Sequence, residues 1–570
     1  MNLPRRLRRA RRILEDARNG LRLYRSSGLM GAFGPLDAAR IARDFATAWR
    51  RGGLSVIHMH AVADPQRPAI VSGDLRLSYA DLDARVNRLT HALGGLGINP
   101  GDRVGLFLKN GHEYLELHLA LSAIGAVGVQ IGYRLKAEEV AYILANAQAK
   151  AIFAHQSLVA VAEEAIDRGS SEGGPLVLTR RELVTTQPVP GLTDYETFLA
   201  SGRPDAPRAV TGRSRGGIMI YTSGTTGRGK GAKRDFGKLG FSSILGLLNA
   251  LPIRRDDRHP CVCPMHHSLA AMFVTPVLAF GGCVVIHEHF EAEAALVAIE
   301  RERITSVLMV PTMMQRLLAL PKETLYKHDT SSLRWIMSGA APLPADVARK
   351  VEDQFGPILY NMYGATETGL VTLALPGEHT ARPGTIGRAI VGNKIRLLDE
   401  QGHDVPDGEV GELYVRNGMM MDAYHGNESA TKEAMRDGYL SVGDLARRDA
   451  DGYYFIADRK TDMVISGGVN IYPWEIEQRL HQHPAIQEAA VVGVPDPEWG
   501  ESLVAWIVPK GTERPTPEAI GEFVREELAD YKRPRNVVFV DELPRNPTGK
   551  ILKRELKAQW IAEHAPRGAA

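Results

Sequence analysis

Tyr221-Thr-Ser-Gly-Thr-Thr-Gly-Arg-Gly-Lys-Gly231 follows directly on a short apolar run, Gly217 to Tyr221. The run is typical of a buried strand, so we expect the loop to leave the carboxyl end of that strand. The loop combines Ser and Thr hydroxyls, backbone N–H groups and one ammonium, a set that suits polyphosphate oxygens. The stretch therefore predicts a phosphate-binding loop, with a solvated glycine-rich surface loop as the alternative.

The loop also comes close to the Walker pattern, because Gly224, Gly229 and Lys230 fit its spacing. Position 231, however, is Gly where that pattern needs a Ser or Thr hydroxyl for magnesium. Gly237 and Gly240 would weaken a helix immediately after the loop. These departures argue against a P-loop.

Around this loop, between about 215 and 369, short β-rich runs alternate with helical patterns, which predicts a parallel sheet covered by helices. The expected strands after the first are Cys283 to Ile286, Ser306 to Val310, Leu333 to Met337 and Ile358 to Met362, and the expected helices include Glu291 to Arg303 and Pro344 to Phe355. Ligands of such sheets bind at the carboxyl ends of the strands. The residues to examine there are Ser338 to Pro342 and Tyr363 to Glu367.

Beyond about residue 370 the sequence pattern changes to short strands separated by turns. The expected strands include Ile395 to Leu398 and Gly411 to Val415, which indicates a β-rich subdomain. A compact mixed unit follows from about Thr461. Its expected helices are Pro473 to Gln482 and Pro517 to Ala529, and its expected strands are Glu488 to Val492, Leu503 to Val508 and Asn536 to Val540.

Six ordered motifs together resemble the adenylate-forming superfamily of acyl-CoA synthetases, luciferases and adenylation domains. Besides the loop they are Ser338-Gly-Ala-Ala-Pro342, Tyr363-Gly-Ala-Thr-Glu367, Ser441-Val-Gly-Asp444, Asp458-Arg-Lys-Thr-Asp462 with Ser466-Gly-Gly468, and Asn546-Pro-Thr-Gly-Lys550. The resemblance covers roughly residues 50 to 560. It implies an α/β fold: a basic arm (1–50), a large AMP-binding domain of parallel-sheet layers with a β-rich subdomain (51–457), a hinge (458–461) and a small, mobile α+β domain (462–570).

The resemblance also implies roles for single residues. Tyr363 would stack on adenine, Thr366 would contact the α-phosphate, Asp444 would hold the ribose, and Glu367 would ligate Mg²⁺. The catalytic residues would be Lys550, Glu367, Thr366 and Lys230. The full ATP site would comprise Thr222, Ser223, Gly224, Thr225, Thr226, Gly227, Lys230, Gly339, Ala340, Ala341, Pro342, Tyr363, Gly364, Thr366, Asp444, Arg459 and Lys550. Taken singly, most of these would be ordinary core, turn or surface residues.

Outside the nucleotide site, the resemblance points to His267 in the acyl pocket and to Ser466, Gly467 and Gly468 against the pantetheine arm of coenzyme A. Cys261 and Cys263 near these histidines suggest a zinc site, but no second ligand pair accompanies them, so we disfavour zinc. Two positions depart from the family pattern. Gly229 replaces the usual Pro of the loop, and Thr461 stands at the hinge where Asp or Lys is common.

The implied reaction joins a carboxylic acid to ATP as an acyl-adenylate, releasing pyrophosphate, and then transfers the acyl group to coenzyme A. The candidate pocket segments, Met265 to Phe273 and Ser306 to Met314, are mostly apolar, which favours a fatty or other hydrophobic acid. The chain ends soon after Lys550, so a free thiol is the simpler acceptor. Loading of a carrier protein, a luciferase-like oxygenase and an inactive scaffold remain as alternatives.

Composition limits the other possibilities. Sixty-nine basic and sixty-seven acidic residues leave a net charge of +2, so no global field favours nucleic acid. Three cysteines are too few for a disulfide framework, which favours a cytoplasmic protein.

The uncharged segment Ser268 to Ile286 is long enough to span a membrane, but Pro276 and the glycine pair favour a broken helix and a buried strand. The arginine-rich arm, Arg5 to Arg12, is interpreted as solvated, with peripheral membrane contact as the alternative. The oligomeric state is not predicted.

Overall fold

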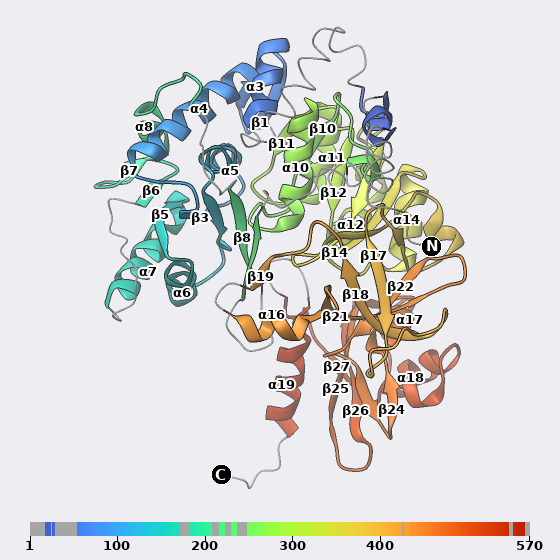
Figure 1. Ribbon diagram of the computed structural model, residues 1–570. Helices are drawn as coiled ribbons and strands as arrows, with labels where there is room; N and C mark the ends of the chain where they lie inside the picture. Colours follow the sequence, from blue (N-terminus) through green and yellow to red (C-terminus); the bar gives the residue numbers. More distant parts are fainter. Residues whose placement is uncertain are drawn as a thin grey trace, which may run out of the picture.

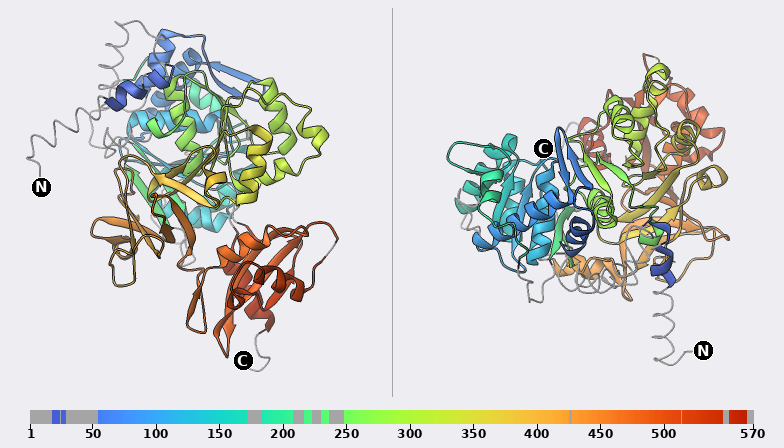
Figure 2. Two further views of the ribbon diagram at one scale, coloured as in Figure 1. Left: turned by 90° about the vertical axis from the view of Figure 1, so that its right-hand side faces the viewer. Right: turned by 90° about the horizontal axis from the view of Figure 1, so that it is seen from above.

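The chain folds into a large multilayered part and a smaller lobe formed by its last hundred residues, as the computed structural model shows (Figure 1). Figure 2 shows the lobe below the rest of the molecule, joined to it near one edge. The structure describes residues 18–23, 25–28, 54–171, 183–207, 216–222, 230–235, 248–424, 427–512, 514–545 and 551–564. The expected α/β class, with a large first domain and a small last one, is confirmed.

Three sheets build the large part, within the described residues. The first has the order β19 (Ala423–Tyr424), β9 (Lys230–Asp235), β8 (Gly217–Thr222), β4 (Val127–Gln130), β3 (Arg103–Phe107), β5 (Ala149–Ala154), β6 (Leu183–Thr185) and β7 (Thr193–Asp194). The second has the order β12 (Ser306–Met309), β13 (Trp335–Ser338), β14 (Leu359–Ala365), β15 (Gly369–Ala374), β16 (Thr385–Ala389), β22 (Tyr454–Arg459), β21 (Tyr439–Arg448), β18 (Val410–Arg416) and β17 (Lys394–Leu398), with β20 (Met435–Arg436) beside β21. The third has the order β10 (Arg258–Cys261), β11 (Cys283–Ile286), β1 (Pro68–Ser72) and β2 (Leu75–Ser78).

Helices cover these sheets, and their apolar faces form the core. They include α3 (Leu54–Ala63), α4 (Tyr79–Gly95), α5 (His112–Ile124), α6 (Ala137–Ala147), α7 (Val159–Ser171), α8 (Tyr195–Ala200), α10 (Ser268–Phe280), α11 (Ala292–Arg301), α12 (Pro311–Leu318) and α14 (Ala345–Phe355). In α14 the buried residues Val347 and Val351 lie one turn apart, as the helical spacing predicts.

The predicted strands of the central region exist, but the single parallel sheet expected for them is wrong. They belong to three sheets, because β8 pairs with β4, β11 pairs with β1 and β10, and only β12, β13 and β14 are consecutive neighbours. The pairing of Ile70 with Val284 joins segments more than two hundred residues apart. Local periodicity carries no information about such pairings.

The helix expected to break near Pro276 is instead continuous. α10 runs through this proline and ends at Gly281, whose φ is +89°. Phe273, Val277 and Leu278 are almost completely buried, so the packing of the helix outweighs the hydrogen bond that proline cannot donate. The buried strand expected after it is β11. Within the described residues, every helix is too short or too polar to cross a membrane.

The lobe has a sheet and a core of its own. Its strands are β24 (Val469–Ile471), β23 (Val464–Ser466), β26 (Gly500–Pro509) and β25 (Ile486–Asp496), with β27 (Asn536–Phe539) beside β26. Its helices are α17 (Pro473–Leu480), α18 (Pro517–Arg525) and α19 (Lys553–His564). The two apolar clusters of the lobe contain only residues from Val464 onward. A separate core is what allows a domain to move as a unit.

Candidate active site

The glycine-rich loop connects two antiparallel strands, because Thr222 at the end of β8 pairs with Lys230 at the start of β9. A P-loop leads into a helix, so this strand agrees with the rejection of that motif. Ser223, Gly224, Thr225, Thr226, Gly227 and Gly229 lie outside the described residues, as do the side chains of Thr222 and Lys230 and the whole of Lys550. Their predicted roles stay predictions.

Two of the predicted motifs lie side by side, because β13 and β14 are parallel neighbours with Ser338 opposite Asn361. Gly339 to Pro342 follow β13, while Tyr363 to Glu367 comprise the last residues of β14 and the first residues of the turn after it. A Cβ atom on Gly339 would lie 2.9 Å from Cγ of Met362, so the close approach of the two segments needs a glycine. Ala340 has a φ of +68°, a conformation that non-glycine residues seldom adopt.

Tyr363, Asp444 and Arg459 form one hydrogen-bonded group. The Tyr363 hydroxyl donates to Oδ2 of Asp444 at 2.6 Å, and Nε of Arg459 lies 3.2 Å from Oδ1 of the same carboxylate. β21 and β22 bring Asp444 opposite Arg459, while Tyr363 comes from β14. Burial raises the pKa of Tyr363, so its hydroxyl stays protonated as the donor. Three predicted nucleotide-binding side chains from distant parts of the sequence thus meet here.

Glu367 lies in the turn after β14 and is only 8% exposed. Its Oε1 accepts a hydrogen bond from the Tyr424 hydroxyl at 3.2 Å, and Thr366 is half-buried beside it in the same turn. Burial and this carboxylate raise the pKa of Tyr424. A nearly buried carboxylate with a neutral hydroxyl as neighbour has the hard oxygen atoms that Mg²⁺ prefers. The residue fits its predicted role as a magnesium ligand.

A cavity of about 840 Å³ opens next to the end of β13. Its walls include the predicted acyl-pocket residue His267, together with Leu269, Val310 and Met313 from the segments expected to bind the acyl group, and Ala340. Burial lowers the pKa of His267 to about 4, so its ring is neutral near pH 7. Among the described residues, nothing is hydrogen-bonded to Nε2 of His267 or to either ring nitrogen of the adjacent His266. The cavity thus combines apolar side chains from both predicted acyl-pocket segments with a neutral histidine whose Nε2 has no hydrogen-bond partner among the described residues.

The sulfur atoms of the neighbouring cysteines contact backbone carbonyl oxygens. Sγ of Cys261 contacts the Cys263 carbonyl oxygen at 3.6 Å, and Sγ of Cys263 contacts the Leu308 carbonyl oxygen at 3.7 Å. In the part of the chain that the structure describes, no three His, Cys, Asp or Glu side chains are grouped as a metal site.

The residues predicted to contact pantetheine lie away from this cavity. Ser466, Gly467 and Gly468 form the turn between β23 and β24, and none of them lines the cavity. Both glycines are exposed and have a positive φ, which permits the tight turn. The predicted hinge residue Thr461 is exposed between β22 and β23.

Sequence motifs missed several residues that line the cavity. They are Tyr133 and Arg134 after β4, Arg316 of α12, and Lys510 and Arg545 of the small domain. These residues belong to no recognisable motif, and only the fold brings them together.

Comparison with known proteins identifies two matching family models. Residues 57–425 match the model described as AMP-binding enzyme, and residues 475–550 match the model described as AMP-binding enzyme C-terminal domain. Feruloyl-CoA synthase of an Amycolatopsis species is 37% identical over 87% of this chain and 96% of its own length. Indoleacetate–CoA ligase of Aromatoleum aromaticum is 34% identical over 88% and 96%. The crystal structure of the anthranilate CoA ligase AuaEII with anthranoyl-AMP superposes with a TM-score of 0.80 at 28% identity, covering 89% of this chain and 97% of that one.

Proposed function

Because the chain belongs to the AMP-binding enzyme family, we propose that it is an ATP-dependent ligase that joins a hydrophobic carboxylic acid to coenzyme A. The observation that carries the proposal is that Tyr363, Asp444 and Arg459 form one hydrogen-bonded group on the same sheet whose strand β13 ends beside the cavity of His267. A nucleotide site and an acid site on one sheet can bring the two reactants together, which the transfer of an adenylyl group to an acid requires.

In the first half-reaction, a carboxylate oxygen of the acid attacks the α-phosphorus of ATP, and the bond to the β-phosphate oxygen breaks. Pyrophosphate leaves and acyl-AMP remains. The protein holds the adenosine through Tyr363 and Asp444 and orients the two reactants. No protein nucleophile takes part, so the rate acceleration comes from orientation and charge neutralisation. Lys230 and Lys550 supply cationic groups for that charge.

A Mg²⁺ ion bound with the triphosphate would neutralise phosphate charge, and Glu367 is the residue that would hold it. Glu367 itself stays fixed by its turn and by the hydrogen bond from Tyr424.

In the second half-reaction, the thiol sulfur of coenzyme A attacks the acyl carbon of acyl-AMP. The mixed anhydride bond breaks, AMP leaves and a thioester forms. Ser466 to Gly468 must approach the acyl site for the pantetheine arm to pass beside them, so this step needs a rotation of the small domain about residues 458–461. The separate core of that domain supports such a motion.

The acid is hydrophobic in this proposal, because Leu269, Val310 and Met313 line the cavity beside His267. A medium- to long-chain fatty acid is the substrate that the sequence favours. The relatives compared above are named for acids with aromatic rings, so aromatic acids belong in the same trial.

The first test measures ATP–pyrophosphate exchange with fatty acids of graded length and with aryl acids, and it identifies the products. We expect hydrophobic acids to stimulate exchange, with AMP and pyrophosphate as products and a thioester after addition of coenzyme A. Lys550→Ala should reduce exchange by about a hundredfold or more, by analogy with the loss of one preorganised charge.

Lys557→Ala provides the matched control, because Lys557 is another lysine of the same region whose partner is Glu501. This variant should exchange at the wild-type rate. Release of ADP and orthophosphate, or full exchange in Lys550→Ala, would contradict the proposal. Transfer to a pantetheinylated carrier protein in place of coenzyme A, or light emission, would favour the other activities of the family.

A further inference from the structure

Two segments of the large domain that follow neighbouring strands line the cavity of His267. We call residues 262–267, after β10, the β10 wall, and residues 287–290, after β11, the β11 wall. The strands are parallel neighbours in the third sheet, with Cys261 opposite Ile286, so both walls leave the same end of that sheet. The side chains that line the cavity are Val262, Cys263, Pro264 and His267 of the β10 wall and Glu288, His289 and Phe290 of the β11 wall.

The side chain of Asn110 is hydrogen-bonded to both walls. Its Nδ2 donates to the Cys263 carbonyl oxygen at 3.1 Å and to the His287 carbonyl oxygen at 3.0 Å. Its Oδ1 accepts a hydrogen bond from the backbone N–H of Met265 at 2.8 Å. Asn110 is not among the described residues that line the cavity. One amide therefore ties the two walls together from behind, through two backbone groups of the β10 wall and one of the β11 wall.

The three backbone partners of Asn110 require an amide at this position. Two carbonyl oxygens need two donors and one N–H needs an acceptor, and a primary amide supplies this combination. A carboxylate could accept from the N–H but could not donate to the carbonyl oxygens. Asn110 follows β3 of the first sheet, whereas both walls extend from the third sheet. The side chain thus also joins two sheets at the ends of their strands.

The adjacent residue, Lys109, differs from Asn110 in the strength and number of its links to the walls. Its Nζ lies 2.7 Å from Oε1 of Glu288, whose side chain is 52% exposed. Among the described residues, this is the link from the Lys109 side chain to the cavity walls, and it reaches the β11 wall alone. An exposed ion pair contributes little to holding a segment in place. The two neighbouring side chains therefore allow a matched comparison.

We infer that Asn110 is a positioning residue that makes the enzyme select its acid by size. This inference rests on the proposed function, in which the cavity binds the acid. The amide fixes the β10 wall and the β11 wall relative to each other. The backbone N–H of His267 donates to the Pro264 carbonyl oxygen at 3.1 Å, so the turn that carries His267 begins within the segment that Asn110 holds. Walls that are fixed before the acid binds cost less ordering and reject an acid of the wrong size.

The test measures ATP–pyrophosphate exchange by Asn110→Ala with acids that differ by single methylene groups. We expect the KM for the preferred acid to rise about tenfold, since the freed walls must be ordered when the acid binds. The preference for that acid over the acid one methylene longer, as a ratio of kcat/KM values, should fall about threefold or more. The KM for ATP should stay as in the wild type, because Tyr363, Asp444 and Arg459 belong to the second sheet.

Two further variants separate positioning from general damage to the fold. Asn110→Ser keeps a hydroxyl that can donate to one carbonyl oxygen, so it should change the KM and the preference in the same direction by a smaller factor. Lys109→Gln is the matched control and should keep the wild-type KM and preference. Neither quantity depends on the concentration of active enzyme, so partial misfolding of a variant would not imitate the effect.

An unchanged KM for the acid and an unchanged preference in both Asn110 variants, even with a lower Tm, would overturn the inference. Equal changes in Lys109→Gln would also overturn it, because any disturbance behind the walls would then have the same effect. A wild type that exchanges with no acid would contradict the proposed function, and the inference with it. That result comes from the wild type alone, so the two failures are distinguishable.

Discussion

At the residue scale, the carboxylate of Asp444 is the common partner in the group of predicted nucleotide-binding side chains. Its two oxygens are held by Tyr363 and Arg459, so it is oriented before any nucleotide binds. A preoriented carboxylate costs little further ordering when it accepts hydrogen bonds from the ribose hydroxyls. Tyr363, in contrast, would use its ring for adenine and its hydroxyl only to fix Asp444.

This division of roles predicts unequal effects for two conservative substitutions. Asp444→Asn should raise KM for ATP about tenfold, because charge-assisted hydrogen bonds become neutral ones. Tyr363→Phe keeps the ring and should raise KM for ATP only about threefold, since one oriented hydrogen bond is lost. Initial rates at varied ATP concentration measure both effects. An equal or larger effect of Tyr363→Phe would show that the hydroxyl contacts the nucleotide directly.

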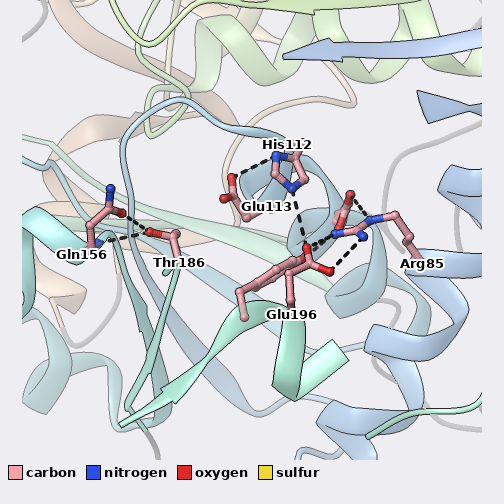
Figure 3. Close-up of polar contacts among 8 residues, drawn as sticks. Arg85, His112, Glu113, Gln156, Thr186 and Glu196 are labelled. Atoms are coloured by element: carbon pink, nitrogen blue, oxygen red, sulfur yellow. Dashed lines mark hydrogen bonds and ion pairs between the residues drawn. The ribbon is translucent and has the colours of Figure 1, made fainter. Parts of the chain in front are cut away.

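At the element scale, one buried carboxylate links three helices of the large domain, and its arginine partner Arg85 also reaches Glu196 (Figure 3). Glu116 of α5 is fully buried, and it accepts hydrogen bonds from Nε of Arg85 in α4 at 2.8 Å and from the Tyr195 hydroxyl in α8 at 2.7 Å. Arg85 also pairs with Glu196 of α8 at 2.6 Å. The guanidinium therefore shares its charge between a buried and an exposed carboxylate.

Removing the buried charge of Glu116 should lower the free energy of unfolding more than removing the exposed charge of Glu196. Glu116→Gln leaves a mostly buried Arg85 with one partner, so we expect a destabilisation of about 2 kcal/mol. Glu196→Gln removes a carboxylate whose side chain is 58% exposed, and this should cost about 0.5 kcal/mol or less. Thermal unfolding of both variants provides the comparison. Equal shifts in Tm would mean that burial of Glu116 adds nothing to the interaction.

The same elements show where sequence patterns reach their limit. Residues 283–286 and 345–355 form the expected strand and helix, because a short apolar run is typical of a buried strand and the helical spacing of apolar residues determines the buried face of the helix. The link from Arg85 to Glu196 spans 111 positions and has no periodic signature. For the same reason, the motif at Tyr363 could be recognised from the sequence, whereas the cations at 134, 316 and 510 could not.

At the scale of the whole molecule, the two domains are joined at Asp458, a buried carboxylate of the predicted hinge. Asp458 is the penultimate residue of β22, and its Oδ2 accepts a hydrogen bond from the backbone N–H of Trp474 in α17 at 2.9 Å. Lys553, at the start of α19, pairs with Glu477 at 2.8 Å and also attracts Asp458. Burial raises the pKa of Asp458 to about 6, although Lys553 acts in the opposite direction.

This raised pKa predicts how the join between the domains depends on pH. The ordinary pKa of an aspartate is 3.8, so between about pH 4 and pH 6 the folded protein binds a proton that the unfolded chain does not. Stability from Asp458 is therefore present at pH 4 and is lost as the pH rises through 6. Burial lowers the pKa values of His60 and His259 to about 4 and about 3. Below pH 6.5 these histidines therefore make the free energy of unfolding rise with pH, the opposite of the effect of Asp458.

The useful quantity is the difference in Tm between the wild type and Asp458→Asn, measured from pH 4 to pH 8. Because Asn cannot titrate, the wild type should lose Tm relative to the variant across this range. A difference that is constant with pH would mean that Asp458 is already ionised at pH 4, and the join between the domains would then be insensitive to pH.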